Sequence, residues 1–184
     1  MRLLPALLVV LVLGGTASAL EVAGVQVQPA VTVDNHVLKL NGSGVRRKFM
    51  VKVYVGSLYA TRPVRTPAEA LSDKGDKLIR MNFLYSKVER EKIVEAFQEG
   101  FRNNSPQVAD TPEARSFLAL FTGDFRRGDL VDLTLGGDGT VTVKHNGRLL
   151  GTVHSPRLAV AILAIYLGDK PADEGLKKGM LGGE

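Results

Sequence analysis

The chain is 184 residues long, a length that fits one domain built around a single hydrophobic core. It has no cysteine, which excludes disulfides, thiolate metal sites, thiol chemistry and a lipid anchor attached to cysteine. Its 24 Lys and Arg exceed its 19 Asp and Glu, but the basic residues are scattered and no aromatic residues interleave with them, so we predict no nucleic-acid binding.

The first 19 residues have the pattern of a cleavable signal peptide. Met1-Arg2 supplies a positive start, Leu3–Leu13 is nearly all apolar, and Ala17–Ala19 is a small-residue cleavage site. The apolar run is about eleven residues, against the roughly 20 that span a bilayer, so we predict cleavage rather than a membrane anchor. The remaining residues, 20–184, then form one periplasmic or secreted domain with no stable membrane insertion and a net charge of 23 − 19 = +4.

The first part of this domain is strand-like. Apolar residues alternate in stretches over Val22–Leu40, and Asn41–Gly44 predicts a turn after them. Phe49–Tyr59 is rich in β-branched and aromatic residues, which predicts a strand with a bulge at Gly56. Thr66–Leu71 begins with an N-cap residue and a proline and predicts a short helix.

A strand and a long helix are expected next. Lys77–Tyr85 alternates again, as a strand does. Ser86–Glu89 matches a capping box, in which the serine and glutamate side chains each satisfy an exposed amide at a helix start. We expect this helix to run to about Asn103 and to bury one apolar stripe. The stripe consists of Ile93, Val94, Phe97 and Phe101.

A second helix and a three-stranded meander follow. Thr111–Gly123 begins with an N-cap and a proline, and its apolar face is Ala114, Phe117, Leu118 and Phe121. Asn146-Gly147 is a strong hairpin signal, because both residues tolerate positive φ. The three expected antiparallel strands are Leu130–Leu135, Thr140–His145 and Arg148–Val153.

The chain closes with helices. Ser155-Pro156 caps a helix in which Leu158–Leu167 is apolar all round but too short to span a bilayer, so we expect it to be buried. Gly168 ends it, and Pro171–Leu181 predicts a further helical turn or two. The order of elements predicts an α+β fold with a largely antiparallel sheet.

Signals for catalysis or metal binding are weak. His36, His145 and His154 have no partner at ligand spacing, and no nucleophile motif is present, so we predict no metal, no cofactor and no catalytic residues. Arg46-Arg47-Lys48 precedes a hydrophobic strand that carries Tyr54. A buried arginine there would receive a carboxylate, whereas solvated arginines at a strand end are the alternative.

The phenylalanines on the two expected helices also allow two interpretations, one functional and one structural. Phe97, Phe101, Phe117 and Phe121 lie at helical spacing. They either line a ligand cavity or form ordinary core, which is the commoner use of such a pattern.

Several segments in order resemble the bacterial chalcone isomerase-like proteins, over almost all of residues 22–182. These segments are Gly44–Lys48 running into Val51–Tyr59, Ile79–Met81, Phe97–Phe101, Gly128-Asp129, Ile165–Pro171, Leu176-Lys177 and Leu181-Gly182. In the family a tryptophan commonly takes the place of Tyr166. The resemblance implies an antiparallel sheet with helices packed on one face and a ligand cleft between them.

The resemblance also implies a set of site residues. Plant members cyclise chalcones as intramolecular lyases, and related members bind fatty acids; their shared arginine matches Arg46, with Arg47 as the alternative. The enzymes' threonine falls at Tyr54, and their tyrosine and asparagine fall near Glu89 and Ala96, so only the arginine is retained.

Three hypotheses follow from this pattern. The leading one is a non-catalytic binder of an amphipathic anion such as a fatty acid. In it, Arg46 and Arg47 hold the anion beside Tyr54, and Phe97 and Phe101 line the tail pocket. The alternatives are an isomerase, in which a tyrosine hydroxyl acts with Arg46 stabilising the developing anion, and a structural or interaction module with no ligand.

Overall fold

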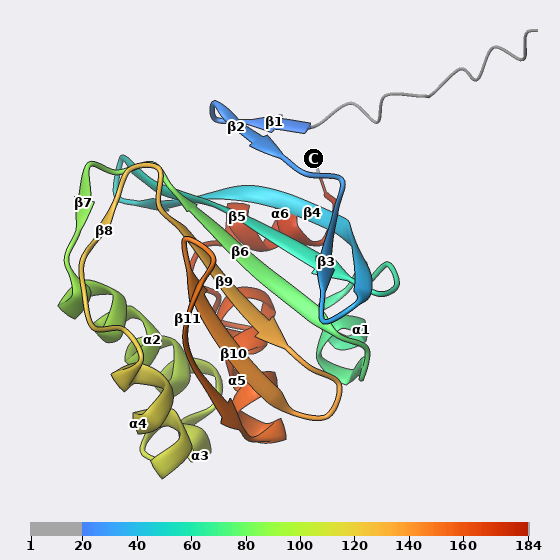
Figure 1. Cartoon of the computed structure of the whole chain (residues 1–184), viewed down its shortest axis with the longest axis vertical. Helices are drawn as coiled ribbons and strands as arrows, with labels where there is room; N and C mark the ends of the chain where they lie inside the picture. The colour runs from blue at the N-terminus through green and yellow to red at the C-terminus, as the bar shows by residue number, and fades with distance from the viewer. Residues whose placement is uncertain (1–19, 184) are drawn as a thin grey trace, which may run out of the picture.

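A curled, seven-stranded antiparallel sheet forms the centre of the structure, a computed structural model that describes residues 20–183 (Figure 1). The predicted signal peptide lies outside the described residues. The sheet order is β11-β10-β9-β6-β5-β4-β3. The strands are β1 (Leu20–Val22), β2 (Val25–Val27), β3 (Ala30–Val33), β4 (His36–Lys48), β5 (Val51–Ala60), β6 (Lys77–Phe83), β7 (Lys87–Val88), β8 (Phe125–Arg126), β9 (Leu130–Leu135), β10 (Thr140–His145) and β11 (Arg148–His154). The helices are α1 (Pro67–Ser72), α2 (Arg90–Asn104), α3 (Pro106–Ala109), α4 (Pro112–Ala119), α5 (Pro156–Leu167) and α6 (Glu174–Met180).

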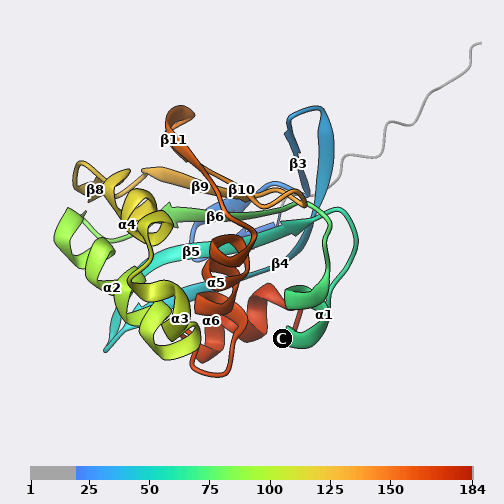
Figure 2. The ribbon, with the colours of Figure 1, turned by 90° about the horizontal axis from the view of Figure 1, so that it is seen from below.

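The helices cover one face of this sheet (Figure 2). The main hydrophobic core lies between that face and the helices, with α5 buried on nearly all sides at its centre. A smaller cluster on the opposite face includes Val55, Tyr59 and Leu78, with Val22, Val25 and Val27 of the β1–β2 hairpin packed against it. The predicted α+β class, with helices on one face of an antiparallel sheet, is confirmed.

The C-terminal half of the chain follows its sequence signals closely. Strands β9, β10 and β11 form the expected meander, and Asn146 and Gly147 both have positive φ (49° and 79°) at the hairpin turn. Ser155 accepts a hydrogen bond from the Leu158 amide at the start of α5. Helix α3 was not expected, and α4 ends at Ala119, four residues before the predicted stop.

The turn predicted at Asn41–Gly44 is wrong, because these residues continue β4 across the sheet. Their glycines serve close packing instead of a turn: a Cβ on Gly42 would lie 2.1 Å from the Gly179 carbonyl oxygen of α6. Gly44 pairs with Gly56 of β5, and α6 also packs over this pair. Gly56 therefore makes room for a helix, and the bulge predicted there is not found.

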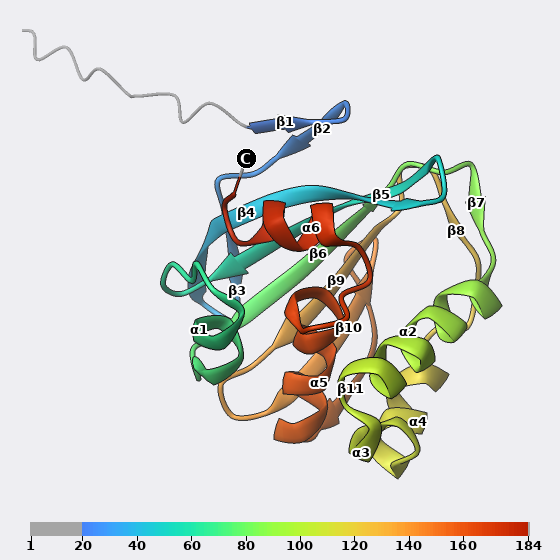
Figure 3. The ribbon, with the colours of Figure 1, turned by 180° about the vertical axis from the view of Figure 1, so that it is seen from behind.

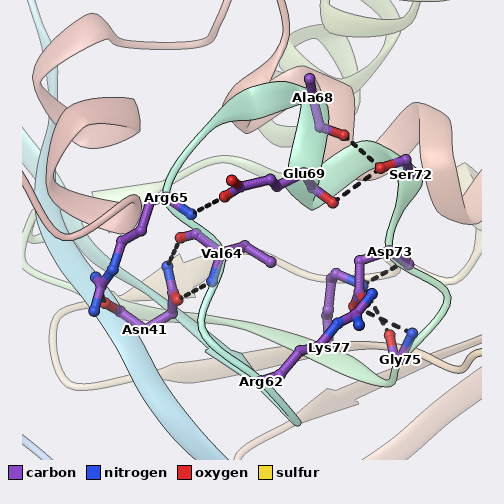
Figure 4. A network of polar contacts seen from close by, with 10 residues as sticks. All are labelled: Asn41, Arg62, Val64, Arg65, Ala68, Glu69, Ser72, Asp73, Gly75 and Lys77. Carbon is purple, nitrogen blue, oxygen red and sulfur yellow. Dashed lines mark hydrogen bonds and ion pairs between the residues drawn. The ribbon is translucent and has the colours of Figure 1, made fainter.

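The β4–β5 hairpin has bulges at two other places, and one of them puts Asn41 out of the regular pairing. Leu40 pairs with Tyr59 and Gly42 with Leu58, so Asn41 is an extra residue in β4. Its buried side-chain amide donates to the Val64 carbonyl and accepts from the Val64 amide, both at 2.8 Å (Figure 4). It also donates to the Met180 carbonyl at 2.7 Å. One side chain thus joins β4, the segment before α1 and the end of α6.

The capping box predicted at Ser86–Glu89 is also wrong. Lys87 and Val88 form β7, which pairs with β8, and Glu89 is the N-cap of α2 without a side-chain hydrogen bond. Asp124 supplies the missing acceptor from outside the helix, because its carboxylate accepts from the Arg90 amide at 3.0 Å. The predicted apolar stripe of α2 is nevertheless confirmed, with Ile93, Phe97 and Phe101 all buried.

Candidate functional site: a cationic cleft beside the β4–β5 hairpin

A cleft of about 520 Å³ opens between the tip of the β4–β5 hairpin, β7 and the first turns of α2. Its volume lies within the range of about 300–1,000 Å³ that is usual for small-molecule sites. The apolar lining is Phe49, Val51, Val53, Tyr85, Val88, Ile93 and Ala96. The charged lining is Arg46, Lys48, Lys87, Glu89 and Lys92. A mainly apolar surface therefore carries four cations and one carboxylate. Lys87 and Lys92 pair with Asp124 and Glu95 outside the lining, whereas Arg46 and Lys48 have no ion-pair partner among residues 20–183 and favour an anionic ligand.

A β-bulge shapes this cleft. Arg46 pairs with Tyr54 and Arg47 with Lys52, so Val53 is an extra residue in β5. Consecutive residues of a regular strand point to opposite faces, but a bulge re-aims one of them. Val53 and Tyr54 both join the core on the helix side of the sheet, where Arg46, as the partner of Tyr54, also lies. The bulge thus gathers three side chains around one site.

A recess of about 20 Å³ adjoins the cleft at its inner end, and Arg46, Ile93 and Ala96 line both spaces. Its deeper wall includes Tyr54, Tyr166 and Ala172. A cavity of this size holds about one water molecule or one ligand oxygen. The recess therefore has room for part of a polar head group but not for a hydrocarbon chain.

Arg46 is the polar group best placed to meet such a head group. Its Nε atom is buried and has no hydrogen-bond partner among residues 20–183. Its guanidinium carbon lies 5.6 Å from the centre of the Tyr54 ring, close enough for a cation–π contact. Buried donors are nearly always paired in native proteins, so a free guanidinium nitrogen at a cleft is a candidate for ligand binding.

Two buried tyrosines complete the inner end of the cleft. Burial raises the pKa of Tyr54, although the positive charge of Arg46 opposes this shift. Burial, followed by the neighbouring Tyr54, raises the pKa of Tyr166 well above its ordinary value. Both phenols therefore stay protonated at neutral pH and can act as hydrogen-bond donors. The Tyr166 hydroxyl donates to the Met81 sulfur at 3.4 Å.

Of the five residues predicted to bind the ligand, the structure places three at the site and two away from it. Arg46 and Tyr54 lie together at the recess, and Phe97 lines the recess but not the outer cleft. Arg47 is exposed and lines neither space; its amide donates to Asp173 at 2.8 Å. Phe101 is fully buried, lines neither space and packs edge-on against Phe117, 6.1 Å away between ring centres.

Sequence reasoning did not assign Tyr166, Val53 or Phe49 to the site. Tyr166 is the second-last residue of the apolar helix α5, where it was expected to be core, and only its place in the family pattern marked it. Nothing in the sequence marks Val53 as a bulge residue. The positions near Glu89 and Ala96, where the resemblance places catalytic side chains of the enzymes, both line the outer cleft.

A second cleft, of about 380 Å³, lies between α1, the β9–β10 turn and α5. Its most buried ion pair joins Lys77 and Asp73 at 2.7 Å, and the Lys77 ammonium also donates to the Asp73 and Gly75 carbonyls (Figure 4). The Lys77 ammonium thus has its hydrogen-bond partners within this segment of the chain, which favours a structural role for the pair. Within residues 20–183 there is no cluster of three or more His, Cys, Asp or Glu placed to hold a metal ion, and no helix long and apolar enough to span a membrane.

Comparison with known proteins identifies the family. A chalcone isomerase-like family model matches residues 19–182. Fatty-acid-binding protein 1 of Arabidopsis thaliana is 29% identical over 143 residues, 71% of this chain and 51% of that protein, so the chain spans about half the length of this relative. The crystal structure of an Arabidopsis thaliana fatty-acid binding protein has the same fold, with a TM-score of 0.63 at 22% identity over 83% of this chain and 95% of that one. The chain therefore belongs to the chalcone isomerase-like family.

Proposed function

We propose that the protein is a non-catalytic binder of an amphipathic anion such as a fatty acid, with the anionic head held by Arg46. The observation that carries this proposal is the buried Nε of Arg46, which has no partner among residues 20–183 and lies where the cleft meets the recess. A charged guanidinium without a partner at an apolar cleft is stabilised by an incoming carboxylate.

The neighbouring groups support the same ligand chemistry. The phenols of Tyr54 and Tyr166 both line the recess and stay protonated, since burial raises their pKa values. The Tyr166 hydroxyl already donates to Met81, so Tyr54 is the phenol available to donate to a ligand. A carboxylate only accepts hydrogen bonds, so it matches a site that offers a guanidinium and a phenol donor. The similarity to fatty-acid-binding protein 1 adds support for a lipid carboxylate.

The geometry also supports one position for the hydrocarbon chain of the proposed ligand. The recess is too small for it, and the phenylalanines of α2 and α4 pack on one another, with Phe97 and Phe121 stacked 5.2 Å apart between ring centres. The chain would therefore lie in the outer cleft, against Val51, Val53 and Val88. This arrangement differs from the sequence hypothesis, in which Phe97 and Phe101 lined the tail pocket.

A paired binding experiment tests this function. Dodecanoate and the neutral 1-dodecanol are titrated into the wild-type protein and into Arg46→Met, with Arg47→Met as the matched control. Dodecanoate should bind the wild type, and its affinity should fall about 10- to 100-fold in Arg46→Met, the usual effect of losing a hydrogen bond to a charged group. Dodecanol should be insensitive to this change. An equal loss in the Arg47 variant, or no dodecanoate binding, would refute the assignment.

The isomerase alternative predicts a different result. In that case the wild-type protein would cyclise a chalcone faster than the spontaneous reaction, and Arg46→Ala would abolish the excess rate. Native mass spectrometry of protein purified from its own host adds an independent test, because a binder should retain a co-purifying anionic lipid.

We further propose that the protein is exported, on the basis of the signal-like pattern of residues 1–19. A location outside the cytoplasm would separate the protein from soluble metabolic intermediates and favours a lipid ligand. The mass of the mature protein tests this proposal. Cleavage after Ala19 predicts a chain that begins at Leu20, whereas a mature chain that retains Met1 would overturn it.

A further inference from the structure

The tip of the β4–β5 hairpin carries the two most exposed large hydrophobic side chains of residues 20–183. Phe49 is 90% exposed and Met50 is 95% exposed, and Val51 and Tyr85 beside them are also exposed. Single exposed apolar residues are ordinary, but a group of them at one projecting point marks an interaction site. In Figure 3 this tip and β7 lie at the same end of the molecule.

Phe49 has an unfavourable backbone conformation at the hairpin tip. It is one of two residues that connect β4 to β5, and its φ is +54°. Glycine, asparagine or aspartate normally takes such a position in a two-residue hairpin, because a bulky side chain is strained there. Strained residues of this kind cluster at functional sites. Packing does not explain the phenylalanine, since its side chain is almost wholly exposed.

Cations surround this apolar point. Arg47, Lys48 and Lys52 are exposed, and none of them forms an ion pair within the described part of the chain. Two carboxylates lie nearby: Asp173 accepts from the Arg47 and Leu176 amides, and Glu89 lies 3.9 Å from the Lys87 ammonium. The three cations outnumber them even when both negative charges are counted. The tip therefore has a net positive charge around exposed aromatic and thioether side chains.

We propose that this hairpin tip docks the protein on an anionic lipid surface, with Phe49 and Met50 entering the interface and Arg47, Lys48 and Lys52 meeting the lipid phosphates. Apolar side chains bind at the boundary between head groups and acyl chains, and nearby cations add attraction to anionic lipids. The hairpin tip also forms part of the cleft wall, because Phe49 and Val51 line the cleft. On the proposed function, docking would therefore bring the ligand site against the membrane and let a fatty acid pass directly between them.

Vesicle binding tests the docking surface. Co-sedimentation is measured with vesicles of phosphatidylcholine and phosphatidylglycerol, and with vesicles of phosphatidylcholine alone. The test variant combines Met50→Ser and Lys52→Glu, neither of which lines the cleft. The control combines Val37→Ser and Lys39→Glu at the start of β4, the end of the hairpin away from the tip. Val37 is 60% exposed and Lys39 is exposed, so the two variants match in charge and polarity.

The wild type should bind the anionic vesicles more tightly than the neutral ones, and added salt should weaken the binding. The test variant should lose about 30-fold in affinity from its two-unit change in charge alone. The control should stay within about twofold of the wild type, because its residues lie away from the tip. No binding to anionic vesicles, or an equal loss in both variants, overturns the proposal and points to a protein partner or none for the tip.

Dodecanoate titration without vesicles separates this proposal from the proposed function. Both double variants should bind dodecanoate as the wild type does. If the wild type fails to bind dodecanoate but the vesicle pattern holds, the ligand assignment falls and the docking surface stands. If dodecanoate binds and vesicles do not, the docking surface falls alone.

Discussion

Replacing Gly42 by alanine tests the packing of α6 on the sheet. A Cβ at this position would lie 2.1 Å from the Gly179 carbonyl oxygen, 2.7 Å from the Gly182 amide and 2.8 Å from the Met180 carbonyl oxygen. All three are backbone atoms, so no side chain can rotate to relieve the contact. Ordinary contacts of this kind are 3.4–4 Å, and α6 must therefore move outward by more than an ångström.

The structure sets the size of the effect. Overpacking in a well-packed core costs about 1–3 kcal/mol. Outward movement of α6 would also expose part of Leu176 and Met180, which are 0% exposed, and complete loss of either side chain from a core costs about 2–5 kcal/mol. We therefore expect Gly42→Ala to lower the free energy of unfolding by about 3 kcal/mol, equivalent to about 6–12 °C in Tm.

Chemical and thermal denaturation measure this loss, and hydrogen exchange of the α6 amides shows where it occurs. Gly123→Ala is the matched control, because a Cβ there meets nothing within 4 Å and its φ is not positive. That variant should be neutral or slightly stabilising. A loss below about 1 kcal/mol in Gly42→Ala, or unchanged exchange in α6, would refute the role given to this glycine.

Three further outcomes are expected. The folded pKa values of Tyr54 and Tyr166 lie above the ordinary 10.0, so the stabilisation that these two phenols contribute should be fully present below pH 10 and lost as the pH rises above it. The double Tyr→Phe variant should lose part of this alkaline slope in denaturation series, and Tyr59, whose pKa burial also raises, should keep part of it. Asp73→Ala should cost about 3 kcal/mol in the same measurement, because it leaves the Lys77 ammonium buried without its carboxylate. Phe49→Gly should relieve about 1 kcal/mol of backbone strain and raise Tm while weakening vesicle binding; a lower Tm would contradict the strain.

The sequence predicted those elements whose signals are local. The Asn146-Gly147 hairpin and the Pro-initiated helices α1, α4 and α5 were found because a few neighbouring residues determine them. The glycines of β4 led to a wrong prediction of a turn. They are needed for close contact with the backbone of α6, which lies more than a hundred residues away in the sequence. A glycine that admits another backbone has the same local appearance as a glycine that turns the chain.

The site was predicted to the same limited extent. Arg46 and Tyr54 were identified through the family pattern, and the register places them opposite each other. Tyr166 joins them only because α5 packs against the same face of the sheet, and Val53 joins the cleft only because of a bulge. Neither cause is visible in a stretch of sequence, since both depend on the pairing of distant segments.

The protonation of the inner site bears on whether this cleft binds or catalyses. Cyclisation of a chalcone requires a phenolate nucleophile, so a catalytic site must favour loss of a substrate proton. The titratable groups that line the recess are a guanidinium and two phenols whose pKa values burial raises. Glu89 is exposed at the outer cleft, and the half-buried Asp173, whose charge also raises the pKa of Tyr54, accepts from the Arg47 and Leu176 amides. The recess lining therefore supplies hydrogen-bond donors and, among the described residues, contains no carboxylate that could take the substrate proton. It is therefore better matched to a ligand that arrives already ionised, as a carboxylate does at neutral pH.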